Sequence, residues 1–405
     1  MVHAWPFDPA WPPSGQAVED TFSFQTEIIT SRSGRESRRA RREAPRRAVR
    51  HGLILHGEDL RLYKDILWNW QPQDFVMADI VRRVTLPATL SAGASTFTLG
   101  SPAGWMVAGL TLILGTGEDR EDREVLTIDS VAGSVVTLTT AALATWPADT
   151  PVYAGLLGNL ATSMSADRQT TNVATAEVSF TVRPLSEPAR AVSAAPLLLD
   201  DREVFLRRPN WLERVASAMS HEVDILDYGV GPIYRYAPVP FGQEITGATY
   251  LGRNVAEVDD ILDVFFRMRG RQGELWMPTW EPDFLLRGTS SAGSSTVRVK
   301  GPRVAEMYAA SATHRAIFAL REDGSVALHK TASITAVNDG QGNDSLINLI
   351  TPLTQDLSST ITVITGWLLL RRFASDSLTV EWLTHSVANL RLNLTTLEMR
   401  PPESP

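Results

Sequence analysis

The residues best suited to chemistry are arginines gathered in one short segment. Nine of them lie within residues 32–50, where Glu36 and Glu43 are the only acids. A guanidinium group binds phosphate, or binds a carboxylate through two parallel hydrogen bonds. The nine residues are Arg32, Arg35, Arg38, Arg39, Arg41, Arg42, Arg46, Arg47 and Arg50.

Three interpretations of this arginine run are open. The run lacks the aromatic side chains that stack on bases, and residues 229–249 hold no second cluster, which counts against a repeated nucleic-acid site. A separate acidic stretch contains Glu118, Asp119, Glu121 and Asp122. We favour pairing across subunit contacts over a solvated surface or a DNA contact. The predicted interface arginines are Arg35, Arg38, Arg39, Arg42, Arg46 and Arg47.

No other group of residues has the spacing of a catalytic or metal site. His51, His56 and Glu58 match no standard ligand pattern, and Ser220-His221-Glu222 stands without a nucleophile motif. No phosphate-binding or dinucleotide-binding glycine loop occurs. The chain has no cysteine, which excludes disulfides, thiol catalysis and iron–sulfur clusters. We expect no catalytic residues, no metal and no cofactor; a hydrolase is the third-ranked alternative.

Composition is that of a globular protein. The chain has 405 residues, enough for two or three domains, with 43% apolar and 21% charged residues. The net charge of −8 argues against a surface that binds nucleic acid throughout. No apolar run is long enough for a membrane helix, and the N-terminus has no signal pattern. We expect a soluble protein made in a cytoplasm.

A repeat at an offset of 200 residues organises the chain. The segment 89–99 (TLSAGASTFTL) reappears as 289–299 (TSSAGSSTVRV). The same offset aligns Met77 with Met277 and Leu86 with Leu286. We predict a duplication covering roughly 21–190 and 220–400.

The elements of each copy position these residues. We expect opening strands at 22–30 and 222–226 and a helix at 255–267, where apolar residues recur at helical spacing after the N-cap residue Asn254. A strand at 275–277 follows, and then short strands separated by glycine turns. The predicted class is mainly β (α+β), with two tandem units. Each unit is a split β-barrel-like core with one helix and an inserted small β-barrel or sandwich module.

The predicted boundaries follow from this pattern. They are an extended arm at 1–20, a first unit at 21–87 and 162–190 with an inserted module at 88–161, a linker at 191–210, a second unit at 211–287 and 367–400 with an inserted module at 288–366, and a loose tail at 401–405.

Tryptophans next to prolines are further interface candidates. Trp5 and Trp11 lie in the arm, which we expect to dock on the protein's own surface or on a neighbour. Trp280 lies in an extended segment between two prolines. Tryptophan is enriched at protein interfaces, so we predict subunit contacts at all three.

Two segments resemble the distal-tail proteins of long non-contractile-tailed bacteriophages and gene transfer agents. The first is Glu27–Arg39 together with Pro45-Arg46-Arg47, and the second is Phe265–Pro278. Together they carry the family pattern over about a third of the chain, although 69–72 (NWQP) departs from the glycine-rich exit of that pattern.

This resemblance implies a structural virion protein at the tail tip, in the baseplate ring that connects the tail tube to the central hub and fibres. Two units per chain would let three subunits form a pseudo-six-fold ring, which we prefer to a ring of six chains. Expected partners are the chain itself, the tube protein, the hub and the receptor-binding fibres, with DNA passing through the lumen and no membrane insertion. The alternative is a glycan- or receptor-binding protein that uses Trp105, Trp146 or Trp367.

Overall fold

The computed structural model describes residues 3–8, 17–115, 123–184, 195–239, 241–340 and 342–399. These residues form mainly antiparallel strands and three helices, α1 (Glu58–Asn69), α2 (Val255–Met268) and α3 (Arg303–Tyr308). The prediction of a mainly β protein is confirmed. The strands form no closed barrel within these ranges, so the expected barrel closure is not found.

The first half, residues 3–184, is built on a sheet of six neighbouring strands. Only the β1–β6 pair is parallel, and α1 connects β5 to β6. In order across the sheet, the strands are β1 (His3–Ala4), β6 (Asp74–Thr85), β11 (Pro151–Leu160), β13 (Val173–Val182), β5 (Arg46–His56) and β2 (Val18–Ser23).

The second half, residues 195–399, has neighbours in the corresponding order. Here only β15–β20 is parallel, and α2 follows β19. His3 pairs with Phe75 and Glu203 with Leu275, so this register repeats at an offset of 200. In order, the strands are β15 (Arg202–Val204), β20 (Leu275–Pro278), β27 (Thr362–Phe373), β29 (Ala388–Thr396), β19 (Gln243–Gly252) and β16 (Ala216–Ser220).

Each half also contains a smaller module with its own apolar core. In the first module β8 pairs with β11, and in the second β23 pairs with β27. In order, the modules contain β7 (Thr96–Thr98), β10 (Val135–Leu138), β9 (Glu124–Ala132) and β8 (Thr111–Leu114), then β22 (Thr296–Val299), β25 (Gly342–Leu349), β24 (Val326–Asp339) and β23 (Ala316–Arg321).

The predicted helix at 255–267 matches α2 to within one residue. Its apolar positions face the core, and the Asn254 side chain accepts a hydrogen bond from the backbone N–H of Glu257 at 2.9 Å.

The prediction of a single strand at 22–30 is wrong. This segment is divided into β2 and β3 (Thr26–Thr30), because the chain turns at Phe24 to follow the second half.

Two further predictions are corrected near the chain's linkers. Residues 202–204 of the expected linker form β15 within the second sheet, and the strand expected at 222–226 is shorter, as β17 (Asp224–Leu226).

The described part of the N-terminal arm docks on the chain itself. β1 adds to the sheet and Trp5 is 0% exposed, because its indole fills the core beside Phe7 and Phe75.

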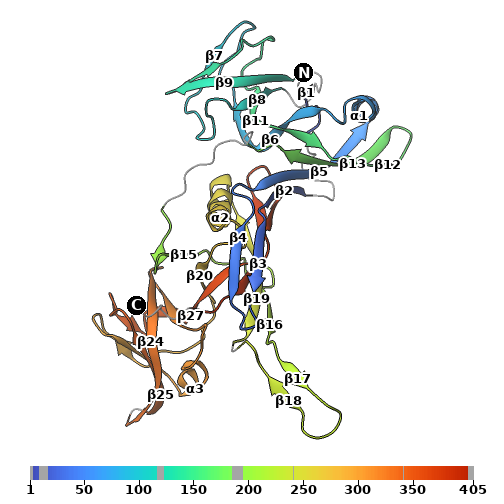
Figure 1. Ribbon diagram of the computed structural model, residues 1–405. Helices are drawn as coiled ribbons and strands as arrows, with labels where there is room; N and C mark the ends of the chain where they lie inside the picture. The colour runs from blue at the N-terminus through green and yellow to red at the C-terminus, as the bar shows by residue number, and fades with distance from the viewer. Residues whose placement is uncertain are drawn as a thin grey trace.

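One apolar core extends through both sheets, from Trp5 to Leu397. Figure 1 shows the first half at the top and the second half below it, with β3 and β4 running down from the junction along the second half. A second hairpin, β17 with β18 (Tyr234–Tyr236), projects away at the lower right.

Candidate assembly interface

Strand β2 joins the two halves by backbone hydrogen bonding at both of its edges. One edge pairs with β5 of the first half, and the other pairs with β28 (Ser377–Trp382) of the second. The second pairing runs from Val18 opposite Trp382 to Ser23 opposite Ser377. β28 pairs in turn with β29, so one continuous set of ladders crosses the junction.

Asp376 receives the chain where it leaves β2. Its two carboxylate oxygens accept from the Thr26 N–H at 2.7 Å and hydroxyl at 2.8 Å, and from Arg271 N–H at 2.9 Å and Nε at 3.2 Å. Burial by itself would raise the pKa of Asp376. The hydrogen bonds from Arg271 and Thr26, together with the Arg271 charge, outweigh burial and lower this pKa below its ordinary value.

Aromatic side chains fill the space beside this carboxylate. Phe22 packs edge-on against Phe266 of α2 with ring centroids 5.3 Å apart, and Phe24 packs against Phe265 at 5.5 Å and Phe266 at 6.0 Å. Phe22 and Phe24 are both buried. The β2 segment therefore buries apolar surface in addition to adding a strand.

The hairpin of β3 and β4 (Glu36–Ala40) continues across the second half. Arg38 donates to the Gln272 carbonyl at 3.0 Å and forms an ion pair with Glu274. Arg372 donates to both oxygens of Glu36, at 2.8 and 2.6 Å. One face of the hairpin thus forms charge-assisted hydrogen bonds with the other half of the same chain.

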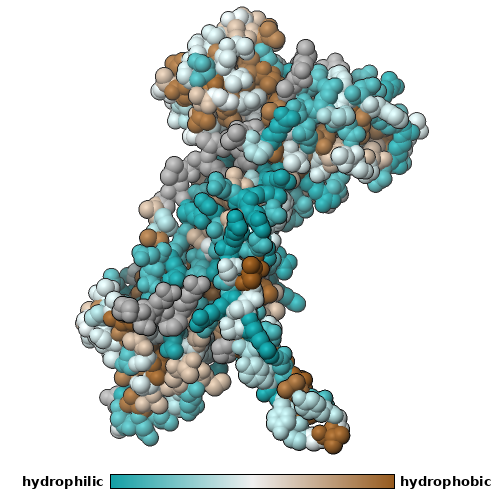
Figure 2. Space-filling model, viewed as in Figure 1, coloured by the Kyte–Doolittle hydropathy of each residue, from teal (hydrophilic) through white to brown (hydrophobic). Residues whose placement is uncertain are grey.

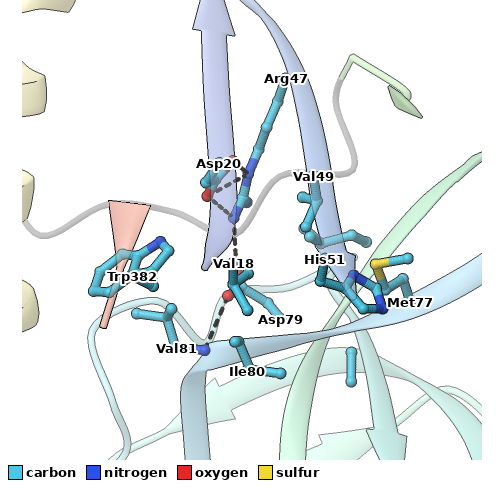
Figure 3. A pocket seen from close by; sticks show the side chains of 12 residues that line it. Val18, Asp20, Arg47, Val49, His51, Met77, Asp79, Ile80, Val81 and Trp382 are labelled. Carbon is cyan, nitrogen blue, oxygen red and sulfur yellow. Dashed lines mark hydrogen bonds and ion pairs between the residues drawn. The ribbon is translucent and has the colours of Figure 1, made fainter. Parts of the chain in front are cut away.

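Buried ion pairs lie beneath β2, where Figure 3 shows Arg47 pointing at Asp20 and toward Asp79. Burial would raise the pKa of Asp79, but the charges of Arg47 and Arg82 and the hydrogen bond from Arg47 lower it. Arg82 donates to both oxygens of Asp259 on α2, at 2.7 and 2.9 Å, and so links the halves a third time. The cavity here holds only about 20 Å³, room for roughly one water.

Several of the arginines predicted to contact another subunit have partners within the chain. Arg38 and Arg47 find carboxylates within the chain, and Arg42 donates to the Ser23 carbonyl at 3.4 Å. Arg35, Arg39 and Arg46 are exposed, and no salt bridge joins them to another described residue. The acidic residues Glu118, Asp119, Glu121 and Asp122 lie outside the described residues, as does Trp11.

The predicted interface tryptophans that the structure describes pack inside the chain. Trp5 lies in the core, and Trp280 is buried against Phe318 at 5.5 Å with the Arg208 guanidinium over its ring. Both rings are therefore buried within the chain itself. The sequence-based prediction missed Asp376, Asp259 and Glu274. No local pattern marks them, because their partners lie far away in the sequence.

A cleft of about 690 Å³, lined by several charged side chains, lies in the second half. Burial raises the pKa of Glu281 and of Asp283, and the charges of nearby carboxylates raise both pKa values further. Arg371 donates to Glu244 at 2.9 Å on the same wall, and Trp211 is exposed at the rim. Such a cleft can bind a polar ligand.

The tryptophans proposed for sugar binding are buried. Trp105, Trp146 and Trp367 are all buried, the first two in the core of the first module and Trp367 in the core of the second. Trp146 also donates its indole N–H to Glu124 at 2.7 Å. All three rings fill apolar cores, and Trp367 also lies in the wall of the cleft of the second half.

Within the described ranges, no group of three or more potential metal ligands comes together. No helix in the same ranges is long and apolar enough to span a bilayer. No protein-family model matches the sequence, and no curated protein matches it.

Proposed function

We propose that this chain is a structural protein of a bacteriophage tail tip, a subunit of the ring that connects the tail tube to the hub and fibres. The observation that carries the proposal is the junction built from β2, the β3–β4 hairpin and Asp376. In this junction, β2 of the first sheet adds to β28 of the second half, and the β3–β4 hairpin packs along the second half. This is a means of linking successive units around a ring.

The two halves are, in this proposal, two copies of one unit. Support comes from the sequence repeat at an offset of 200, from the corresponding order of strand neighbours, and from the placement of α1 and α2 between equivalent strands. Three chains of two units each would supply six similar positions, which suits contact with a six-fold tube above and a three-fold hub below.

The test is the location of the protein in virus particles. Antibodies raised against the purified protein should label the tail end distal to the capsid on particles released by cells that carry the gene. Cryo-electron microscopy of the same particles should reveal three copies in one ring. If mass spectrometry finds the protein absent from purified particles, the proposal is refuted.

The cleft of the second half supports a second candidate function, the binding of a glycan or another polar receptor group. Exposed Trp211 could stack on a sugar ring while Glu281 and Asp283 bind its hydroxyls. A glycan array probed with the protein and with its Trp211→Ala variant tests this. Binding that does not depend on Trp211, or no binding, counts against the cleft as the receptor site.

A further inference from the structure

Strand β16 has a free edge where β2 has none. β2 pairs with β5 and with β28, whereas β16 pairs with β19, and its other edge has no partner among the described strands. All five residues of β16 are exposed. An exposed strand edge with small side chains readily accepts another strand.

The hairpin that follows β16 is exposed and apolar. It occupies the position in the second half that β3–β4 occupies in the first, between the two corresponding strands. Figures 1 and 2 show it projecting from the molecule with apolar residues along it. Apolar surface of this extent on a projecting hairpin indicates a binding surface. Its exposed side chains are Ile225, Leu226, Tyr228, Val230, Ile233, Tyr234 and Tyr236.

The first half has an unfilled site of matching shape. α1 and α2 each connect equivalent strands of their halves, and both bury apolar residues along the face that packs on the sheet. Counted from the helix starts, Trp68 lies in the turn of α1 that corresponds to the turn of α2 holding Phe265 and Phe266. Phe266 is covered by Phe22 and Phe24, but Trp68 is 84% exposed.

Trp68 borders a hollow of about 360 Å³ that also contacts Lys64, Gln71 and Met164. Met164 lies in the loop between β11 and β12 (Ala166–Arg168), and the corresponding loop of the second half, between β27 and β28, carries Asp376. The hollow is therefore located where the second half holds the segment after β2.

The strand pairing needed to fill this site is also available. β12 corresponds to β28, since each follows the same loop and pairs with the last strand of its half, β13 or β29. β28 also pairs with β2, while the second edge of β12 has no partner within the described ranges. A free edge on the first half thus matches the free edge of β16.

We propose that the second half of one copy binds the first half of a second copy, with β16 added to β12 and the segment after it covering Trp68. This inference rests on the proposed function and names its self-contact. Each contact has its counterpart at the junction inside the chain. The contact is head-to-tail, so repetition generates a ring where the rotation closes.

The register of the β2–β28 ladder fixes which residues should meet. Phe22 lies opposite Arg47, and Met219 lies opposite Glu244. Arg47 and Glu244 occupy corresponding places, because the strand registers of the two sheets match from the parallel pair across to these strands. Met219 therefore takes the place of Phe22. It is 82% exposed, and its thioether would rest near Trp68 in the second copy.

One step along the same ladder, Thr21 lies opposite Thr379, with the two hydroxyls 2.9 Å apart. The corresponding residues at the proposed contact are Ala218 of one copy and Ser165 of the other. Both are small and exposed, so cysteine at either position should leave the fold intact.

Paired cysteines test the register directly, because the natural chain contains none. Ala218→Cys protein mixed with Ser165→Cys protein should yield a disulfide-linked pair of chains under mild oxidation. The doubly substituted chain should yield closed or extended multimers. Ala218→Cys mixed with Ser134→Cys, an exposed turn residue of the first module, is the matched control and should not cross-link.

Trp68→Ala and Met219→Asp supply a second measurement on the otherwise natural chain. Each should raise the dissociation constant for self-association, measured by sedimentation, by about 30-fold or more, as for an aromatic anchor at an interface. A chain that stays monomeric, or that associates without the Ala218–Ser165 cross-link, overturns this contact. The tail-tip proposal would then still stand or fall by the location of the protein in particles.

Discussion

Replacing Asp376 with asparagine tests the junction at its most connected residue. Each carboxylate oxygen accepts two hydrogen bonds, one from Thr26 and one from Arg271. Asparagine has the same shape but carries an NH₂ group in place of one oxygen. Whichever way the amide is oriented, its NH₂ faces two donors, and at least one of those is a backbone N–H.

The expected cost follows from those donors. An unsatisfied buried donor costs about 1–3 kcal/mol, and this site is only partly buried, so we expect Asp376→Asn to destabilise the junction by about 2–3 kcal/mol. Because the pKa of the Asp376 carboxyl is lowered in the folded state, its stabilisation is present above its unfolded pKa and is lost as pH falls through the folded value. The difference between wild type and variant should therefore shrink below about pH 4.

Hydrogen exchange measures this opening without requiring the whole chain to unfold in one step. Backbone amides of residues 18–30 should exchange about 30- to 150-fold faster in Asp376→Asn at neutral pH. Glu381→Gln on the same strand, β28, is the control and should leave exchange unchanged, because Glu381 is exposed. Unchanged protection of residues 18–30 in the Asp376 variant would refute the assigned role of this carboxylate.

Three further outcomes can be checked by unfolding measurements. Arg47→Ala removes the guanidinium that pairs with the buried carboxylates of Asp20 and Asp79, and we expect a loss of about 3–5 kcal/mol in denaturant unfolding. Gly158→Ala makes a Cβ collide with the backbone carbonyl of Thr181, so its melting temperature should fall well below that of a substitution at an exposed glycine. Burial lowers the pKa of His51 to about 4, with a smaller opposing effect of Asp8. Because the unfolded chain then binds the proton first, stability should decline as pH falls from about 6.5 toward 4, and His51→Phe should flatten that decline. An equally steep decline in the His51 variant would assign the pH dependence to other groups.

Much of the secondary structure could be predicted from local patterns. The apolar spacing and the N-cap at Asn254 located α2, and the aromatic run located β20. These predictions succeeded because both signals involve residues within a turn or two of each other, where helical and strand geometry alone decide which side chains share a face.

The arginine run illustrates what local patterns could not supply. Its composition indicated carboxylate partners, and among the described residues Arg38 pairs with Glu274 and Arg47 with Asp20, acids that no local pattern had marked. Any carboxylate attracts a guanidinium, so charge alone does not select among 46 acidic residues.

By itself the sequence determined the mainly β character, a helix at 255–267 and the recurrence of one segment 200 residues later. Only the tertiary structure decided that β2 crosses to β28, that Asp376 holds the turn after it, and that Trp68 is left uncovered. The physical reason is that backbone N–H and C=O groups are the same at every strand edge. Which edges meet depends on how distant segments pack, and that is settled only when the whole chain is folded.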